Sequence, residues 1–346
     1  MTKLAFLAGL FALTACAPGD NKPLRIAAPV EPPSAAPAPA PAAQDPIAAA
    51  ESTDPCAAQP APATVPLPER VTLGAFWQAM AEQVELLDSA SLADSYAEFA
   101  ARHQVDAETP GLRRDFARLW AAFEATRDGG WWRLRWAVTD QEPRTHEIWK
   151  AWRRSPPSAQ FDGPSAVAEC DEITALFSVA ARRLGVRGVG LFYPTWNHVI
   201  AGWMPEALSK RSSGGVVLVP TTQIFLSCES TFDQTSFGTP TKVYEYPLRD
   251  TPDDTELPRA LAEFLLEQVR AYGEATPELL SLIRTKRAEL LSSSLGNCSG
   301  YRAQLAAEIA PRLTCADRRA LRHLAAEELA RPELSEAELL SWLAAD

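Results

Sequence analysis

The sequence lacks the excess of basic residues that nucleic-acid-binding proteins carry. It has 33 Lys and Arg against 44 Asp and Glu, a formal net charge of -11, whereas nucleic acid is normally bound by a basic face. Beyond the first 17 positions it has no apolar run of about 18 residues, so it predicts no membrane-spanning helix. It has only four histidines, which argues against a zinc site, and no glycine-rich phosphate loop, which argues against a nucleotide site. We therefore expect no metal, no cofactor and no nucleic-acid partner.

Residues 1–15 have the features of an export signal. Lys3 precedes a short apolar stretch, 4–12, which is typical of a secretory signal rather than a membrane span. The next residues, Leu13-Thr14-Ala15-Cys16, resemble the lipobox of bacterial lipoproteins. That resemblance implies that Cys16 becomes the acylated first residue of the mature chain, and two or three acyl chains would anchor it to a membrane. Ala17, in place of the Asp that marks inner-membrane retention in that family, implies the outer membrane. The alternative is an ordinary secretory signal with an incidental cysteine.

Composition divides the rest of the chain into a tether and a folded part. Fourteen of the 29 prolines lie in residues 17–68, interspersed with alanine, and such a stretch forms an extended tether rather than a core. We expect the tether to span residues 16–68. The folded part is predicted to consist of a helical region at 69–155, an α+β core at 156–250 and a second helical region at 251–346.

The six cysteines predict disulfides, because export leads to an oxidising compartment. Acylation of Cys16 leaves five others. Cys298 and Cys315 lie 17 positions apart around a helical stretch, and we expect them to pair. Cys56 with Cys228 is then the remaining pair by elimination, and Cys170 is left as a thiol.

A helix followed by short strands is predicted around Cys170. Residues 166–184 have helical periodicity and end at Gly185. The expected strands are 189–193, 198–203 and 216–219, which suggests an antiparallel α+β module. Cys170 lies on the apolar face near the start of the helix, where amide groups and the helix dipole favour a thiolate.

His198 is the histidine best placed to serve such a thiolate. It opens a strand and shares one face with Ile200 and Gly202. If that face packs beneath the helix, the imidazole meets the Cys170 thiol. The alternatives are an inert buried thiol and a core histidine.

The segment 169–186 resembles the active-site helix of the transglutaminase-like superfamily. It reads Glu-Cys-Asp-Glu at its start and Arg-Arg-Leu-Gly-Val at its end, and the following strands carry Asn197-His198-Val199 and Val219-Pro220-Thr221. The resemblance covers about 60 residues, 163–223. It implies a nucleophile helix packed on an antiparallel sheet, with Cys170 as the nucleophile and His198 as the base.

The sequence does not decide which residue is the third member of the implied triad. The family has an Asp where this chain has Val219, which cannot accept a hydrogen bond. Gln223 is the favoured substitute, and Thr221 is the other, because an amide or hydroxyl can orient an imidazole. Trp196, beside the histidine, would shield the pair from water or simply pack.

The resemblance implies amide hydrolysis or acyl transfer through a thioester. The reachable substrates would be envelope proteins or peptides on the periplasmic or surface side of the membrane. The alternative is a catalytically inactive transglutaminase-like domain that acts as a tethered protein-binding module.

Overall fold

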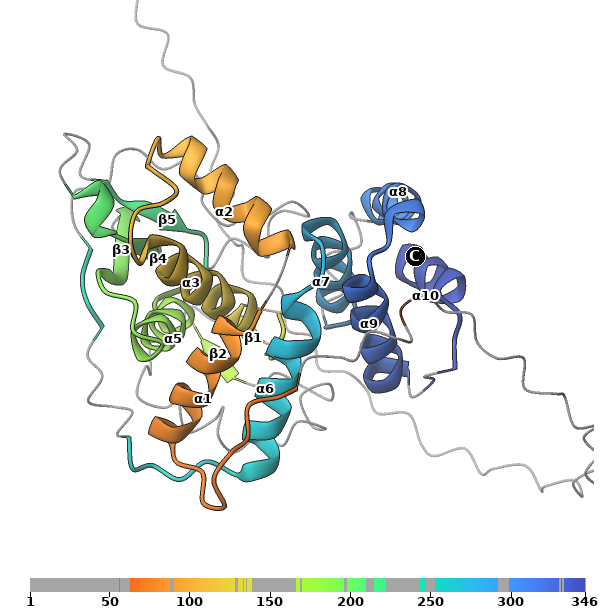
Figure 1. Ribbon diagram of the computed structural model, residues 1–346, viewed down its shortest axis with the longest axis horizontal. Helices are drawn as coiled ribbons and strands as arrows, with labels where there is room; N and C mark the ends of the chain where they lie inside the picture. The colour runs from red at the N-terminus through yellow and green to blue at the C-terminus, as the bar shows by residue number, and fades with distance from the viewer. Residues whose placement is uncertain are drawn as a thin grey trace, which may run out of the picture. The chain divides into compact units, whose positions relative to one another are not determined.

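The computed structural model describes most of the unit Thr53–Asp346. The described residues are 56, 63–87, 90–127, 130–132, 134, 136–138, 166–168, 170–195, 198–209, 215–221, 243–246, 253–291, 299–329, 331 and 333–345. The expected signal 1–15, with Cys16 and most of the tether, lies outside them. The described part is α+β, with helices around a small antiparallel sheet (Figure 1). Within it, no helix is both long enough and apolar enough to cross a membrane.

Three helices lie within the predicted N-terminal helical region 69–155, of which residues 139–155 are outside the described residues. They are α1 (Leu73–Glu85), α2 (Ala90–Arg102) and α3 (Leu112–Thr126). The hydroxyl of Thr72 caps α1 by accepting a hydrogen bond from the amide of Ala75 at 3.2 Å. Just before α1, the amide of Leu257 donates to the carbonyl of Val71 at 3.0 Å, so this region is joined directly to the chain that leads into the C-terminal helices.

The central sheet has the predicted strands in the order β3-β4-β5, all antiparallel. β3 is Val189–Thr195, β4 is His198–Trp203 and β5 is Val217–Val219. α5 (Cys170–Arg183) precedes them and packs on β3 and β4. Gly185 ends this helical segment with φ +91, a backbone conformation that favours glycine.

The predicted start of the central helix was wrong. Residues Ala166–Ala168 form strand β2, which pairs in parallel with β1 (Trp136–Val138) in a separate two-stranded sheet. The helix begins at Cys170. An Ala-Val-Ala sequence suits a short strand or a helical turn, and its pairing with β1, far away in sequence, decides between them.

The two faces of the central sheet belong to different hydrophobic clusters. One face joins the main core, together with the buried residues of α5, and the other forms a small separate cluster. The main-core face carries Val189, Ala201, Trp203, Val217 and Val219. The small cluster consists of Phe192, Ile200 and Leu218, with Val216 packed against it.

The C-terminal region is helical, as predicted. It contains α6 (Arg259–Gly273), α7 (Pro277–Leu291), α8 (Ser299–Ile309), α9 (Cys315–Leu324) and α10 (Glu336–Ala344). The main core runs through α1, α3, α5 and α6 and on into α7–α10, so all three expected folded regions share it. Figure 1 shows α3 beside α5 and α6 beside α1, and these pairs are in contact.

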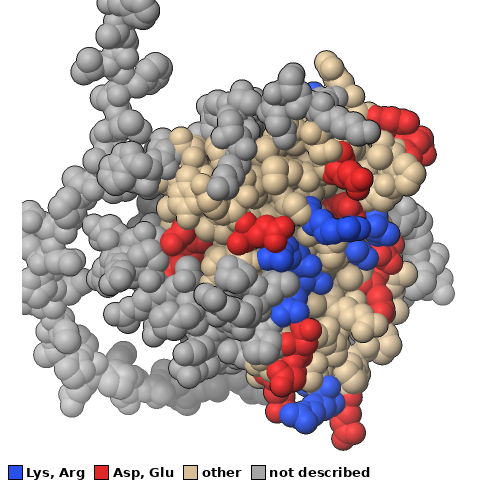
Figure 2. Space-filling view, turned by 90° about the vertical axis from the view of Figure 1, so that its left-hand side faces the viewer, with Lys and Arg blue, Asp and Glu red and all other residues tan. Residues whose placement is uncertain are grey.

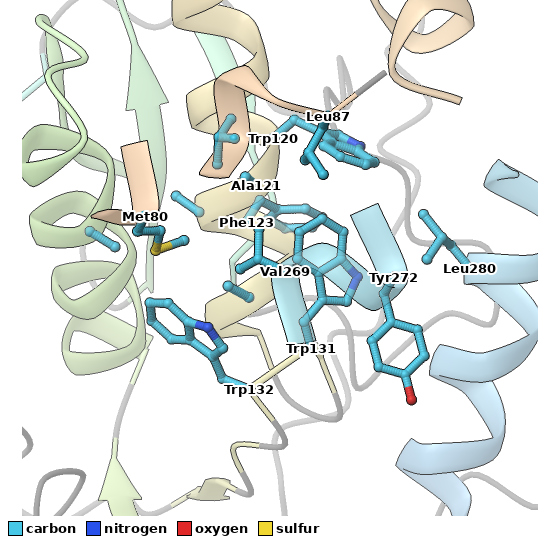
Figure 3. Packing of buried hydrophobic residues seen from close by; sticks show 14 of the residues in the cluster. Met80, Leu87, Trp120, Ala121, Phe123, Trp131, Trp132, Val269, Tyr272 and Leu280 are labelled. Carbon is cyan, nitrogen blue, oxygen red and sulfur yellow. The ribbon is translucent and has the colours of Figure 1, made fainter. Parts of the chain in front are cut away.

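The tryptophan-rich stretch 131–152 begins shortly after α3, and its first two tryptophans pack in this core. Trp131 and Trp132 are buried, and the indole Nε1 of Trp132 donates to the carbonyl of Leu265 at 3.2 Å. Figure 3 shows the Trp131 ring beside Val269 and Tyr272, and the Trp132 ring pointing towards Met80. Trp149 and Trp152, which belong to the same stretch, lie outside the described residues.

The disulfide in the structure differs from both predicted pairs. Cys56 is bonded to Cys315, 259 positions away, with a Cα–Cα distance of 5.3 Å. The expected pairs Cys298–Cys315 and Cys56–Cys228 are therefore wrong, since Cys315 has one sulfur. The stretch between Cys298 and Cys315 includes α8, whose 11 residues extend over about 16 Å. A short sequence separation is thus a poor guide to pairing here, because a helix keeps its two ends apart.

Candidate functional site

Cys170 is the first residue of α5 and is present as a half-buried thiol. Its helix is almost wholly enclosed, since every residue from Glu172 to Ala181 is buried. The acidic residue Glu172, in the first turn of the helix, is only 2% exposed. Enclosure fixes α5 against its neighbours, so the position of the thiol is set by the core. At the first turn, unpaired amides and the helix dipole favour a thiolate.

A hydroxyl pair joins α5 to the sheet one turn after Cys170. The hydroxyl oxygens of Thr174 and Thr221 lie 2.7 Å apart, and Thr174 also donates to the carbonyl of Val199 at 3.5 Å. Thr174 and Thr221 are both buried. Thr221 was predicted as an orienting residue for the imidazole, but the bond that its hydroxyl makes is to the helix. The pair therefore fixes the start of α5 over the start of β4.

Three side chains gather near the thiol. Burial raises the pKa of the Tyr193 phenol, and the nearby charges of Asp171 and Cys170 raise it further. Burial also raises the pKa of Asp171, against the hydrogen bond that its carboxylate accepts from the Glu172 amide. Tyr193 is 47% exposed and meets the ring of Tyr244 edge-on, with centroids 5.7 Å apart. This exposed tyrosine pair was missed in the sequence, where Tyr193 only ends an apolar run.

His198 lies at the same end of the sheet as Cys170. After α5 ends, the chain enters the sheet at Val189, which pairs with Trp203 at the far end of β4. The first turn of α5 therefore lies near the other end, where β3 ends at Thr195 and β4 begins at His198. Burial lowers the pKa of the His198 imidazole. The ring consequently favours its neutral form, which is the form that can accept a proton.

The face of β4 that carries Ile200 does not pack beneath α5. Alternation along β4 places His198 on the face of Ile200 and Gly202, as predicted. This face packs in the small cluster, and a Cβ added at Gly202 would lie 3.4 Å from the Cβ of Phe192. α5 packs on the opposite face, beside Ala201. Both faces of β4 are apolar, so the sequence pattern could not show which one the helix covers.

The remaining predicted site residues divide into two groups. Val219, the position where the family has an Asp, is fully buried in the main core and offers no hydrogen bond to a histidine. Gln223 and Trp196 lie outside the described residues, as do Cys228 and Cys298. The described residues include no group of three or more His, Cys, Asp or Glu that could hold a metal ion. On the face shown in Figure 2, basic and acidic side chains are intermingled beside a broad uncharged area.

The lowered pKa of His198 predicts a pH dependence of stability. The unfolded chain binds a proton near the ordinary imidazole value of 6.5, whereas the folded chain binds it only at a lower pH. Stability that is present above that ordinary value is therefore lost as the pH falls towards the folded value. We expect the free energy of unfolding to fall more between about pH 7.5 and 5 in the wild type than in His198→Gln. Urea unfolding at both pH values measures this, with His103→Gln as the control. Equal losses in the wild type and His198→Gln would contradict the assignment.

Comparison with known proteins identifies no relative, since no protein-family model, no curated protein and no solved structure matches this chain.

Proposed function

We propose that the protein is a membrane-anchored envelope enzyme of transglutaminase-like fold, whose Cys170 thiolate cleaves an amide and transfers the acyl group to water or to an amine. The observation that carries the proposal is the position of Cys170 at the first residue of α5, at the end of the sheet where β4 begins with His198. A thiol at a helix N-terminus beside a histidine-bearing strand is the arrangement that thiol-dependent acyl transfer requires.

The chemistry follows two balanced steps. The Cys170 sulfur attacks the carbonyl carbon of an amide, the C–N bond breaks, and the amine leaves with a proton supplied by the His198 imidazolium. The thioester that remains is then attacked by water or by a second amine, whose proton passes to the neutral imidazole. The thiolate is regenerated, so neither step needs an oxidant, a metal or a cofactor.

The proposal requires the imidazole to reach around the end of the sheet. His198 is the first residue of β4 and therefore lies at that end of the strand. Its lowered pKa suits a proton acceptor at neutral pH. Gln223 is retained in the proposal as the residue that orients the ring, whereas Thr221 serves the helix–sheet contact through its bond to Thr174.

The tyrosine pair supplies a surface for substrate near the thiol. Tyr193 and Tyr244 are 47% and 49% exposed. An isolated antiparallel β-bridge holds Tyr244 beside β3, because the amide of Tyr244 donates to the carbonyl of Leu191 at 2.8 Å and the reverse bond is 2.7 Å. Exposed aromatic rings next to a reactive group bind apolar parts of a peptide well. The substrate class that we propose is therefore a protein or peptide amide in the cell envelope, reached from the anchor at Cys16.

The same tyrosine pair also suits the binding-module alternative, and one experiment separates the two functions. Envelope proteins are incubated with the full-length chain and a fluorescent primary amine, and covalent labelling is followed by gel electrophoresis, with peptide release measured in parallel. The enzyme hypothesis predicts labelled or cleaved proteins with the wild type and neither with Cys170→Ala. Capture of the same proteins by both forms, without labelling or cleavage, would contradict the enzyme hypothesis and support a binding module.

A further inference from the structure

A cavity of about 460 Å³ lies far from the Cys170 end of the sheet in the fold, at the meeting point of three helices. It is formed by the C-terminal end of α1, the beginning of α2 and the first two turns of α3. Its lining residues are Val84, Glu85, Leu87, Leu92, Gly111, Arg113, Arg114, Ala117 and Arg118. Its walls are thus of two kinds: buried aliphatic side chains and a group of three arginines.

The arginines give the cavity a positive charge in a chain whose formal net charge is -11. Glu85 is the one acidic residue of the described lining, and it accepts a hydrogen bond from Nη2 of Arg118 at 2.5 Å. The Nε of Arg118 is buried and has no hydrogen-bond acceptor. Arg114 lies 3.5 Å from Asp115, and Arg113 is exposed and makes no ion pair with a described residue. The described lining therefore contains three arginines and one carboxylate, with Asp115 beside Arg114.

Two of these arginines lie where the helix dipole disfavours cations. Arg113 and Arg114 belong to the beginning of α3, where the helix dipole is positive, and Asp115 in the same turn offsets part of this repulsion. The residue before the helix, Gly111 (φ +78), provides no side-chain cap. A Cβ at Gly111 would lie 3.3 Å from Nη2 of Arg114, so this guanidinium lies close to the uncapped end. A bound anion would offset the repulsion between these charges and the dipole.

We propose that this cavity binds a small organic oxyanion, a phosphate monoester or a carboxylate, that carries an apolar tail. Arginine presents donors in a fork that matches the oxygens of either head group. The tail would pack on Val84, Leu87, Leu92 and Ala117, which are all buried hydrophobic residues. The cavity is in the size range of small-molecule sites, which combine apolar walls with a few placed polar groups.

The test is a calorimetric titration of the full chain carrying Cys16→Ser, which keeps acyl chains off that residue. Octyl phosphate and octanoate are the probes, and octanol and inorganic phosphate are the matched controls for the head group and the tail. Arg113→Glu reverses one charge at an exposed position. Arg312→Glu, an exposed arginine between α8 and α9, is the control for charge reversal elsewhere. Ala117→Phe fills the apolar wall and leaves all three arginines in place.

We expect at least one of the two anionic probes to bind with one-to-one stoichiometry, and the tighter one identifies the head group. Arg113→Glu should weaken it about tenfold or more, Ala117→Phe should abolish it, and Arg312→Glu should leave it unchanged. Far-UV circular dichroism shows that each variant is folded. The proposal is overturned if neither anion binds at millimolar concentration, if octanol binds as tightly, if inorganic phosphate binds as tightly as octyl phosphate, or if Arg312→Glu weakens binding as much as Arg113→Glu.

Discussion

Replacing Cys170 with serine is expected to lower the rate of acylation by p-nitrophenyl acetate by at least about 10³-fold. The wild-type chain should release a burst of p-nitrophenolate and acquire one acetyl group on the peptide that contains Cys170. A serine hydroxyl at the same position is not ionised at neutral pH, and its weak nucleophilicity removes the first step of the reaction. Stopped-flow absorbance measures the burst, and peptide mass spectrometry locates the acetyl group.

The matched control for this experiment is Cys298→Ser, which removes a cysteine from another part of the chain. We expect that variant to keep both the burst and the adduct on Cys170. An acetyl group found on Cys298 or on lysines, with Cys170→Ser as fast as the wild type, would show that Cys170 is not the nucleophile. The activated ester is used because it needs no recognition by the natural substrate site.

Replacing Glu124 with alanine is expected to lower the free energy of unfolding by about 3–5 kcal/mol, which is the usual cost of removing one partner from a buried ion pair. Glu124 lies in the core between two arginines. Nη2 of Arg127 donates to it at 2.7 Å, and Nη1 of Arg284 lies 3.6 Å from its other oxygen. The side chain of Arg127 is 1% exposed and that of Glu124 is 7% exposed. The loss of Glu124 would leave two cations buried without a counter-charge.

The charges around Arg127 explain why the loss of Glu124 is expected to lower the stability so much. Burial, together with the nearby charge of Arg284, lowers the pKa of Arg127 to about 9, and Glu124 opposes that fall. Burial lowers the pKa of Arg284 as well, and Glu124 opposes that fall too. Nε and Nη1 of Arg127 are buried with no hydrogen-bond acceptor, so Glu124 and the ring of Phe123, 4.9 Å from the guanidinium carbon, are its main stabilising contacts.

Glu98→Ala is the control, because Glu98 pairs with Arg102 on the exposed side of α2 at the same kind of helical spacing. Its loss should cost less than about 0.5 kcal/mol. The double variant Glu124→Ala/Arg127→Met should recover part of the stability, since one of the two unpaired cations is gone. Urea unfolding measures all three variants. Losses of similar size for Glu124→Ala and Glu98→Ala would contradict this account of the core.

The local elements could be predicted because their signals are local. The β-branched runs that became β3, β4 and β5 are bounded by turn residues. Gly185 marks the end of the central helix through its positive φ. Periodicity and turn chemistry depend on neighbours in sequence, so a sequence contains them directly.

The errors concern partners that are distant in sequence. The start of α5 was predicted too early because residues 166–168 pair with β1 in a sheet. The disulfide was mispaired because the bond joins Cys56 to α9 across 259 positions. The face of β4 that the helix covers could not be predicted, because Ile200 and Ala201, which belong to opposite faces of β4, are equally apolar. In each case the deciding contact is tertiary, and the segment itself is compatible with either outcome.

The most direct test of the proposed site is the rate of Cys170 alkylation by iodoacetamide as a function of pH, in the wild type and in His198→Gln, with peptide mass spectrometry to assign the modified thiol. If His198 takes the proton from Cys170, the wild-type thiol reacts well below the pH of about 8.5 at which an ordinary cysteine ionises, and His198→Gln shifts the reaction to higher pH. If instead both proteins react along the same curve with a midpoint at or above about 8.5, the imidazole does not serve the thiol and the proposed enzyme has no base.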